Sequence, residues 1–332
     1  MKKMAYFFIF WLIFSSQAHS SLISALQDYS KGVKLVNVGK YDEAIKILNG
    51  VVQENPKLSY ANVLIGICYY NEGYYLSGAN EIEKFIGDLS NASDGSDKYP
   101  LALVYYLRCQ NKLKNFDAIE KYYKFTEEYP IPNITGIVFT ASTLSDTANI
   151  KDCPPDLRKN VSELSLRILD KNKQYGEKEP WFNNAYGLNL MVAQSFLINL
   201  DDQIEDLLKA KKCFELEIGL NKRSVVFVSL SITDRLIAED SIARARKNYL
   251  KFKKENTFED HCAELNEMIK SAFQYYDYSL ADIKNAESAI GAVGQNKKII
   301  WLKKSILDEK DGLRDNDSMI KRIVGCLKSG KE

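Results

Sequence analysis

The sequence has very little histidine, proline and tryptophan. Of 332 residues, two are His, seven are Pro and three are Trp. His19 lies in the N-terminal segment, so a histidine-dependent nucleophile or metal site would rest on His261 alone. Cys262 follows His261 directly, and adjacent residues of a helix point about 100° apart, which does not suit a nucleophile–base pair. Of the nearby ligands, only Glu264 shares a helix face with Asp260 and His261. We therefore expect no catalytic residue, no metal and no cofactor.

Charge of one sign is not in excess. The chain carries 45 Lys and Arg against 44 Asp and Glu, and the balance also holds locally. A surface that follows phosphates needs a basic excess, so we expect no nucleic-acid partner. Residues 244–254 carry six basic side chains and could dock an acidic partner or anionic lipid heads. A helix with basic outer residues and an apolar inner stripe through Tyr249 and Phe252 is the simpler interpretation.

Long apolar runs are missing except at the N-terminus. Lys2 and Lys3 precede eleven almost unbroken apolar residues, 4–14. Ala18 and Ser20 then occupy the −3 and −1 positions of a cut before residue 21, which is the layout of a secretory signal peptide. We predict a signal peptide over residues 1–20, cleavage after Ser20, and a mature protein in the bacterial periplasm or secreted. An uncleaved membrane anchor is the alternative. No integral membrane span is predicted in the mature chain.

Six cysteines remain after this segment, and none is spaced as CxxC. An oxidising compartment permits disulfides, and six cysteines allow 15 pairings, between which the sequence does not decide. We expect at least half of them to be small buried helix residues.

An internal repeat of 34 residues covers the first part of the mature chain. The shift places Gly32 on Gly66, Gly39 on Gly73 and Tyr41 on Tyr75. The run GKYDEAIK at residues 39–46, together with Ala44, Leu48 and Pro56, resembles the tetratricopeptide repeat (TPR) family. Small residues let the two helices of a hairpin approach closely, and glycine permits the turn between them.

This resemblance implies an all-α fold, an α-solenoid of antiparallel helix hairpins. The predicted TPR region is 21–130, with repeats at 25–58 and 59–92 and a degenerate one at 99–130, where Leu113 replaces the turn glycine. Residues 90–98 are interpreted as an inserted loop. Ala118, Tyr122 and Pro130 keep the family's spacing in the third repeat.

Helical patterning continues over residues 131–332 in a more degenerate, TPR-like form. Residues 181–221 are predicted to form a hairpin with Gly187 as the small residue facing Ala210 and Phe214, and residues 225–255 another. Residues 258–278, 280–293, 297–308 and 318–327 also have helical spacing. A strand over 224–232 is the alternative there, because short apolar runs are ambiguous.

In the family, the first helix of each hairpin lines a concave groove. The matching positions predict an apolar groove that holds a protein or peptide partner, formed by Tyr29, Val33, Asn37, Tyr60, Val63, Ile67, Tyr70, Asn71, Leu103 and Leu107. The protein's own terminal helix could fill it instead. Asn37, Asn71 and Asn111 share one repeat position and either bind a peptide backbone or cap their helices.

The predicted function is a non-enzymatic scaffold that binds a partner segment through this groove. The alternative is an accessory factor or carboxylate-based enzyme acting on cell-envelope polysaccharide, with the repeats as a positioning module. Paired carboxylates such as Asp201 and Asp202 are frequent, and their spacing alone does not decide between these functions.

Overall fold

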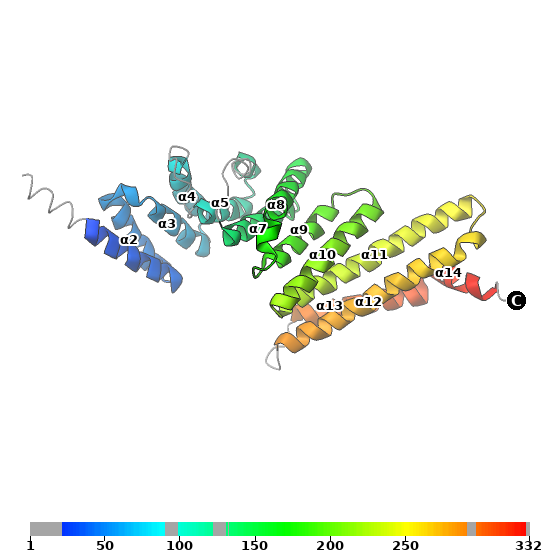
Figure 1. Ribbon diagram of the computed structural model, residues 1–332. Helices are drawn as coiled ribbons and strands as arrows, with labels where there is room; N and C mark the ends of the chain where they lie inside the picture. The colour runs from blue at the N-terminus through cyan, green and yellow to red at the C-terminus, as the bar shows by residue number, and fades with distance from the viewer. Residues whose placement is uncertain (1–21, 90–98, 122–130, 132, 291–296, 330–332) are drawn as a thin grey trace, which may run out of the picture. The chain divides into compact units, whose positions relative to one another are not determined.

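The protein is helical throughout the part that the computed structural model describes, which comprises residues 22–89, 99–121, 131, 133–290 and 297–329. Within these ranges there is no β-strand. The chain divides into two compact units, Met1–Arg158 and Lys159–Glu332 (Figure 1). The all-α fold predicted from the repeat is therefore confirmed. The domain boundary that we predicted after residue 130 was based on the spacing of the repeats. The boundary between the two compact units lies between residues 158 and 159, within a helix.

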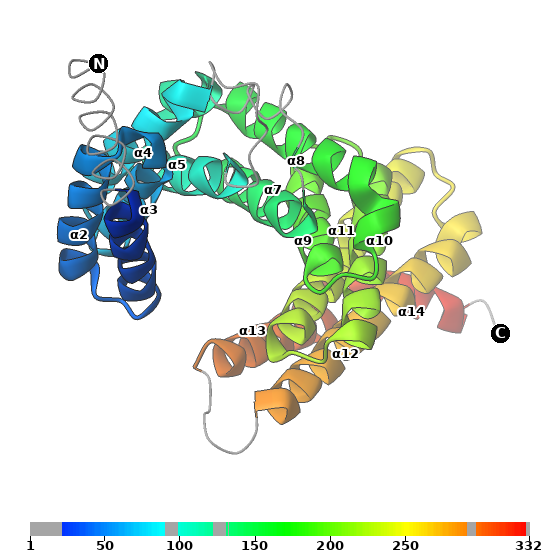
Figure 2. The same ribbon diagram turned by 60° about the vertical axis from the view of Figure 1, so that its left-hand side comes forward.

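The first unit is a series of short helices, each packed against the next along the chain (Figure 2). Its described elements are the helical residues 22–37, α2 (Tyr41–Glu54), η1 (Pro56–Leu58), α3 (Tyr60–Asn71), α4 (Tyr75–Leu89), α5 (Tyr99–Leu113), the helical residues 116–121, and α7 (Ile134–Ala148). Besides these sequential contacts, α5 also touches α3. First helices of successive hairpins thus lie next to one another.

The same turn closes three successive hairpins of this unit. Gly39 and Gly73 have φ angles of 75° and 86°, in the left-handed region that glycine enters without strain. After each, a backbone N–H returns to the carbonyl five residues earlier, at 2.9 Å from Lys40 to Leu35 and 2.8 Å from Tyr74 to Tyr69. This is the hydrogen bond of a Schellman helix end.

The third turn has this geometry without a glycine. Lys114 takes the left-handed conformation, with φ of 54°, and the Asn115 N–H lies 3.0 Å from the Gln110 carbonyl. We predicted that Leu113 would replace the turn glycine, but Leu113 ends α5 and the next residue makes the turn. Lysine reaches this conformation at a cost, which the complete hydrogen-bond pattern offsets.

Close helix contacts explain the small residues of the repeat. A Cβ added to Gly66 of α3 would lie 2.4 Å from Ile82 Cγ1 and 2.8 Å from the Gly78 carbonyl oxygen of α4. A Cβ at Gly32 would lie 2.5 Å from Leu48. Ala44 is fully buried. The predicted packing of small residues between paired helices is therefore confirmed, since any larger side chain would push the helices apart.

The second unit has two long helices in its middle, with shorter helices before and after them. Its elements are α8 (Pro155–Gly176), α9 (Phe182–Gln194), α10 (Leu200–Leu220), α11 (Ser224–Lys254), η2 (Glu259–His261), α12 (Cys262–Ile290), α13 (Lys297–Asn316) and α14 (Ser318–Ser329). The hairpin predicted at 181–221 is confirmed as α9 and α10. A Cβ at Gly187 would lie 2.7 Å from Phe214 Cζ, and Ala210 and Phe214 are fully buried.

The predicted hairpin at 225–255 is wrong, because these residues form the single helix α11 of 31 residues. The two segments predicted at 258–278 and 280–293 likewise share one helix, α12, of 29 residues, and residues 291–293 lie outside the described part of the chain. Neither helix contains Gly or Pro, so nothing in the sequence ends them midway. The strand alternative at 224–232 is also wrong. The two long helices lie side by side along their length (Figure 1).

Four cysteines are free and buried, namely Cys68, Cys109, Cys153 and Cys213. The expectation that at least half would be buried helix residues is confirmed. Cys262 at the start of α12 is joined to Cys326 of α14 by a disulfide, with 6.1 Å between the Cα atoms. The apolar side of the basic segment 244–254 packs here, because Ala245, Tyr249 and Phe252 belong to the same buried cluster as Ile323.

Candidate partner-binding surface

The ten residues predicted to line a groove do not form one open wall. Asn37 and Asn71 are exposed, and Tyr29, Val33, Tyr60 and Tyr70 are half-buried. The other four are core residues, with exposed fractions between 0% and 6%: Val63, Ile67, Leu103 and Leu107. These four cannot contact a partner without rearrangement of the helices.

The burial of α3 has a simple cause. All eight residues from Ala61 to Cys68 are buried, and they are apolar around the helix, with Asn62 as the exception. A helix that is apolar on all sides is packed on all sides. Here α2, α4 and α5 all contact it. The family pattern selected α3 as a groove helix, but it did not show that neighbouring helices would cover its middle turns. Its end residues reach the surface, Tyr60, Tyr69 and Tyr70 in part and Asn71 more fully.

The residues that do reach the surface are largely tyrosines. Burial raises the pKa of Tyr60 to about 12, and the nearby phenols of Tyr29 and Tyr105 add to the rise. Burial also raises the pKa of Tyr29. The three side chains come from the first helices of three successive hairpins, so the stacking of hairpins brings them together.

Further aromatic contacts extend this group. The ring of Tyr70 meets that of Tyr105 edge-on, with centroids 5.5 Å apart, and it lies 5.6 Å from the ring of Tyr75. The Arg108 guanidinium lies 5.3 Å from the centroid of the Tyr105 ring. We call the set Tyr29, Tyr60, Tyr70, Tyr105 and Arg108 the tyrosine surface. Tyr and Arg are the side chains most enriched at the energetic centres of protein interfaces.

Tyr105 and Arg108 were missed from the sequence. Transfer of the family's groove positions to α5 selected Leu103 and Leu107, which are fully buried. The accessible side of α5 instead runs through Leu101, Tyr105 and Arg108, spaced four and three residues apart. This polar and aromatic stripe was visible in the sequence, and a helical projection of α5 alone would have identified it.

The shared asparagines act mainly within the fold. Asn71 Nδ2 donates to the Ile67 carbonyl at 2.9 Å, at the end of α3. Asn111 accepts a hydrogen bond of 3.0 Å from the Thr147 hydroxyl and so joins α5 to α7. Of the two alternatives for this position, the helix-end role therefore describes Asn71, and Asn111 has a different, interhelical role.

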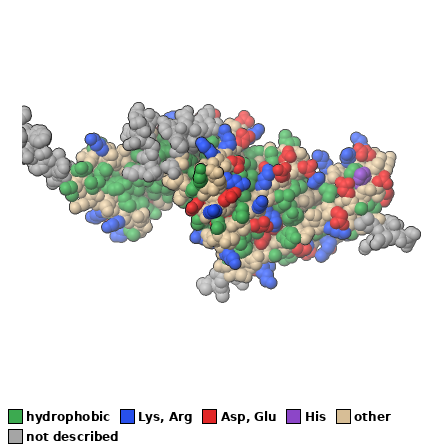
Figure 3. All heavy atoms as spheres, in the orientation of Figure 1, with side chains coloured by type: hydrophobic (Ala, Val, Ile, Leu, Met, Phe, Trp, Pro, Cys, Tyr) green, Lys and Arg blue, Asp and Glu red, His purple; other side chains and the backbone are tan. Residues whose placement is uncertain are grey.

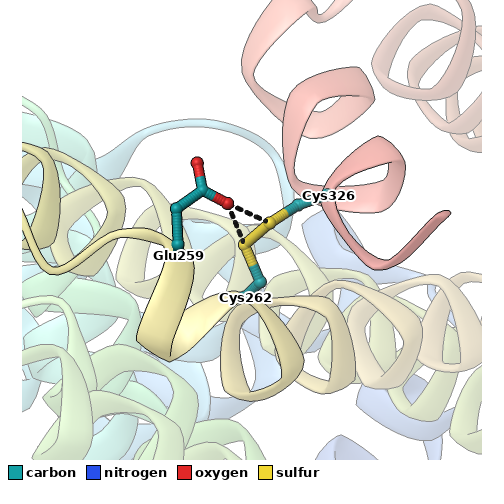
Figure 4. Close-up of a disulfide and its surroundings, with 3 residues drawn as sticks. All are labelled: Glu259, Cys262 and Cys326. Carbon is teal, nitrogen blue, oxygen red and sulfur yellow. Dashed lines mark hydrogen bonds between the residues drawn. A yellow bond between two sulfur atoms is a disulfide. The ribbon is translucent and has the colours of Figure 1, made fainter. Parts of the chain in front are cut away.

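The reactive side chains around His261 make packing contacts, a hydrogen bond and a disulfide. The imidazole stacks on the Phe252 ring, with centroids 3.7 Å apart, and its Nδ1 lies 3.1 Å from Glu264 Oε2. Cys262 is bound to Cys326, and Glu259 Oε2 lies 3.8 Å and 3.1 Å from their sulfur atoms (Figure 4). Two sulfur atoms in a disulfide are poor metal ligands, because thiolates are the form that binds metal.

One group of buried and half-buried carboxylates lies between α10, α11 and α12. The Lys211 ammonium is 2.7 Å from Asp234 Oδ1, and Asp234 is fully buried. Burial raises the pKa of Asp282 to about 7, and the Asp234 carboxylate adds to the rise. A glycosidase pair must reach its substrate from both sides. Asp234 has no exposed surface, so this group does not have the access that the polysaccharide-enzyme alternative requires.

The repeated close helix contacts and Schellman turns decide the fold type. The protein has a TPR-like fold. No protein-family model matches the chain, and no curated protein matches it. None of the helices in the described ranges combines the length and apolar character needed to cross a bilayer.

Solved TPR structures are similar to the chain at low identity. A TPR protein of Thermus thermophilus is 11% identical, with 85% of this chain and 98% of that chain covered and a TM-score of 0.37. The C-terminal part of a TPR repeat-containing protein of Cytophaga hutchinsonii is 16% identical, with 82% and 98% covered and a TM-score of 0.41. A tetratricopeptide repeat protein of Parabacteroides merdae is 14% identical, with 86% and 99% covered and a TM-score of 0.42.

Proposed function

We propose that the first unit is a scaffold that binds a segment of a protein partner through the tyrosine surface. TPR-like folds are generally protein-interaction scaffolds. The observation that carries the proposal is the clustering of four half-buried tyrosines and Arg108 on first helices that stack next to one another. Each phenol offers an apolar ring and a hydroxyl that both donates and accepts, so the surface suits a segment with apolar side chains and polar backbone groups.

The surface is built in a way that limits the cost of binding. Tyr70 is held between Tyr75 and Tyr105, and Tyr60 lies edge-on to Phe85 with ring centroids 5.4 Å apart. Side chains that are already packed lose little rotamer freedom when a partner arrives. Asp146 on α7 lies close enough for Arg108 to oppose the rise of its pKa, so the charge of Arg108 is partly balanced in the free protein.

We further propose that the partner is met outside the cytoplasm. The support is the N-terminal arrangement of Lys2, Lys3, the apolar residues 4–14 and the small residues Ala18 and Ser20. Residues 1–20 lie outside the described part of the chain. The disulfide between Cys262 and Cys326 is also typical of an oxidising compartment.

A photo-cross-linking experiment in intact cells tests the binding proposal. A photoreactive phenylalanine replaces Tyr60, Tyr70 or Tyr105 in turn, and the matched control replaces Tyr74, which is 62% exposed and lies in the turn before α4. We expect one defined protein adduct from the first three positions and none from Tyr74. Tyr105→Ala combined with Arg108→Ala should weaken capture by about tenfold or more. Equal adducts from Tyr74, or no adduct at all three sites, contradict the proposal.

A further inference from the structure

A cavity of about 400 Å³ opens in the second unit, between the beginnings of α11 and α13. Six of its eight lining side chains are apolar, including Val228 and Ile232 of α11 and Trp301 of α13. Its volume lies within the range of small-molecule sites, about 300–1,000 Å³. Trp301 is 67% exposed, which is unusual for the largest apolar side chain.

The lining of this cavity is polarised from one end to the other. Its two polar members are Ser224, the first residue of α11, and Lys298, the second residue of α13. The apolar members continue along the helices to Ile232 and Leu302. One end of the cavity therefore offers a cation and a hydroxyl, and the remainder offers only hydrocarbon and aromatic surface.

Basic side chains predominate around the polar end. Residues 222–233 and 297–307, which include every lining residue, contain six basic side chains, and one of these, Lys303, is paired with Glu287 of α12 at 3.1 Å. Lys222, Arg223, Lys297 and Lys298 lie at the starts of the two helices, where the helix dipole is also positive. The Arg223 guanidinium lies 4.4 Å from the centroid of the Trp181 ring, and the side chains of Lys297 and Lys298 are exposed at the surface. An anionic group would be favoured here.

This polarity distinguishes a hydrocarbon chain from a peptide. A peptide segment brings an N–H and a carbonyl with each residue, and these groups need partners when they leave water. The body of the cavity provides no such partner, since both polar side chains are at one end. A hydrocarbon chain needs none. A molecule with one anionic head and an unbranched apolar tail satisfies both ends of the cavity.

We propose that this cavity binds a single long-chain carboxylate, with its carboxylate at Lys298 and its hydrocarbon chain along Val228, Ile232 and Leu302. The site would give the protein a lipid-derived ligand in addition to its protein partner. It is independent of the proposed function, because it lies in the other compact unit and shares no residue with the tyrosine surface.

Titration calorimetry with the whole protein tests the proposal. Dodecanoate, kept below its micelle concentration, should bind with one molecule per chain. Acetate has the head without the tail, and dodecyltrimethylammonium has the tail with a cationic head, so neither should bind measurably. Binding of the cationic amphiphile equal to that of dodecanoate overturns the proposal. So does sedimentation with phosphatidylglycerol vesicles when monomeric dodecanoate fails to bind, because the site would then be a membrane-contacting face.

Variants locate the binding. Val228→Trp fills the cavity and should weaken dodecanoate binding more than about tenfold. Val225→Asp, at a position 48% exposed, gives the same loss by repulsion where the larger side chain prevents folding. Lys298→Glu should weaken binding about fivefold, whereas Lys304→Glu, on the same helix but outside the cavity lining, should have a smaller effect. Equal effects of the two lysine variants, or wild-type affinity in both cavity variants, contradict the assignment.

Discussion

In the first unit neighbouring helices approach one another through glycine and alanine, whereas in the second unit polar contacts and one disulfide are added to an apolar core between the long helices. Gly66 and Gly78 bring α3 and α4 close enough that each would place a Cβ against the other's carbonyl oxygen. In the second unit, Ser231 and Ser279 join α11 to α12 at 2.9 Å, and Arg235 and Tyr276 both bind Glu309 of α13, at 2.8 Å for the closest pair of each.

The surfaces of the two units also differ, because that of the second unit carries more charged side chains. On the face shown in Figure 3, hydrophobic side chains gather over the first unit with only scattered basic residues, while acidic and basic side chains alternate over the second. Contacts made by small residues depend on backbone shape and leave the remaining face of each helix available for a partner. Where long polar side chains join two helices, they occupy that face and stabilise the fold. The comparison indicates why the partner surface is proposed for the first unit.

Loss of the disulfide is the largest expected change and concerns the second unit alone. The cross-link between Cys262 and Cys326 closes a loop with a sequence separation of 64. A loop of this length contributes up to about 4 kcal/mol by restricting the unfolded chain. Trp181 and Trp301 both lie in the second unit, and residues 22–158 contain no tryptophan, so in a protein prepared without residues 1–20, which include Trp11, tryptophan emission reports on the second unit. We expect reduction to shift the emission-detected urea transition to lower concentration.

The variant Cys262→Ser with Cys326→Ser is the control for this experiment. It should show the reduced transition from the start and no further shift when a reductant is added. The four buried free cysteines should be unaffected in both proteins. A wild-type protein with six alkylatable thiols after denaturation without reductant would contradict the disulfide.

Gly66→Val tests the other side of the comparison. The added side chain would meet Ile82 and the backbone of Gly78, and backbone cannot yield as a flexible side chain can. We expect a loss of about 3 kcal/mol, at the upper end of the usual range for overpacking. Helix content measured by circular dichroism should then decrease at lower urea concentration, while the tryptophan transition stays in place.

Gly50→Ala is the matched control, because no atom lies within 4 Å of a Cβ added at that position of α2. Here the substitution should raise stability by about 0.5–1 kcal/mol, since alanine is the better helix residue. If Gly66→Val shifts both signals together, the two units unfold as one, and the contrast between them has no energetic meaning.

Much of the first unit could be predicted because its pattern follows backbone geometry. The 34-residue period located Gly32, Gly66 and the turns at Gly39 and Gly73 correctly. The long helices of the second unit were predicted as repeats because apolar spacing alone was used, and the absence of Gly and Pro from α11 and α12 was not weighed. That absence is the physical reason that no turn forms.

The candidate site was less predictable than the fold. Tyr29, Tyr60 and Tyr70 were expected at the surface and are half-buried there, but Val63 and Leu103 are in the core. A position transferred from the family pattern indicates which way a side chain points from its own helix. It does not indicate whether the next hairpin covers that side chain. The cavity between α11 and α13 was beyond this approach, because it depends on contacts between helices far apart in sequence.

The smallest expected effect concerns the polar contacts of the second unit and their dependence on pH. Asp282, with a pKa raised to about 7 by burial and by Asp234, stays protonated in the folded protein at pH values where the unfolded chain has lost that proton. The folded state then binds more protons than the unfolded state between about pH 4 and pH 7, so stability falls as pH rises through this window. The Lys211 ammonium and a hydrogen bond with Asn285 oppose the rise of this pKa and moderate the change.

Asp282→Asn keeps the size of the side chain and removes the titration. At pH 8 the variant should be more stable than the wild type by about 1 kcal/mol, a value reduced for the partial exposure of the group to solvent. At pH 5 the two proteins should be nearly equal, because the wild-type carboxyl is then neutral when folded. Tryptophan-detected urea unfolding at both pH values makes the comparison, with Asp308→Asn, at an exposed position of α13, as the control. An advantage of the variant that is the same at pH 5 and pH 8 would show that Asp282 does not titrate in this range, and that the polar contacts of the second unit hold their strength regardless of pH.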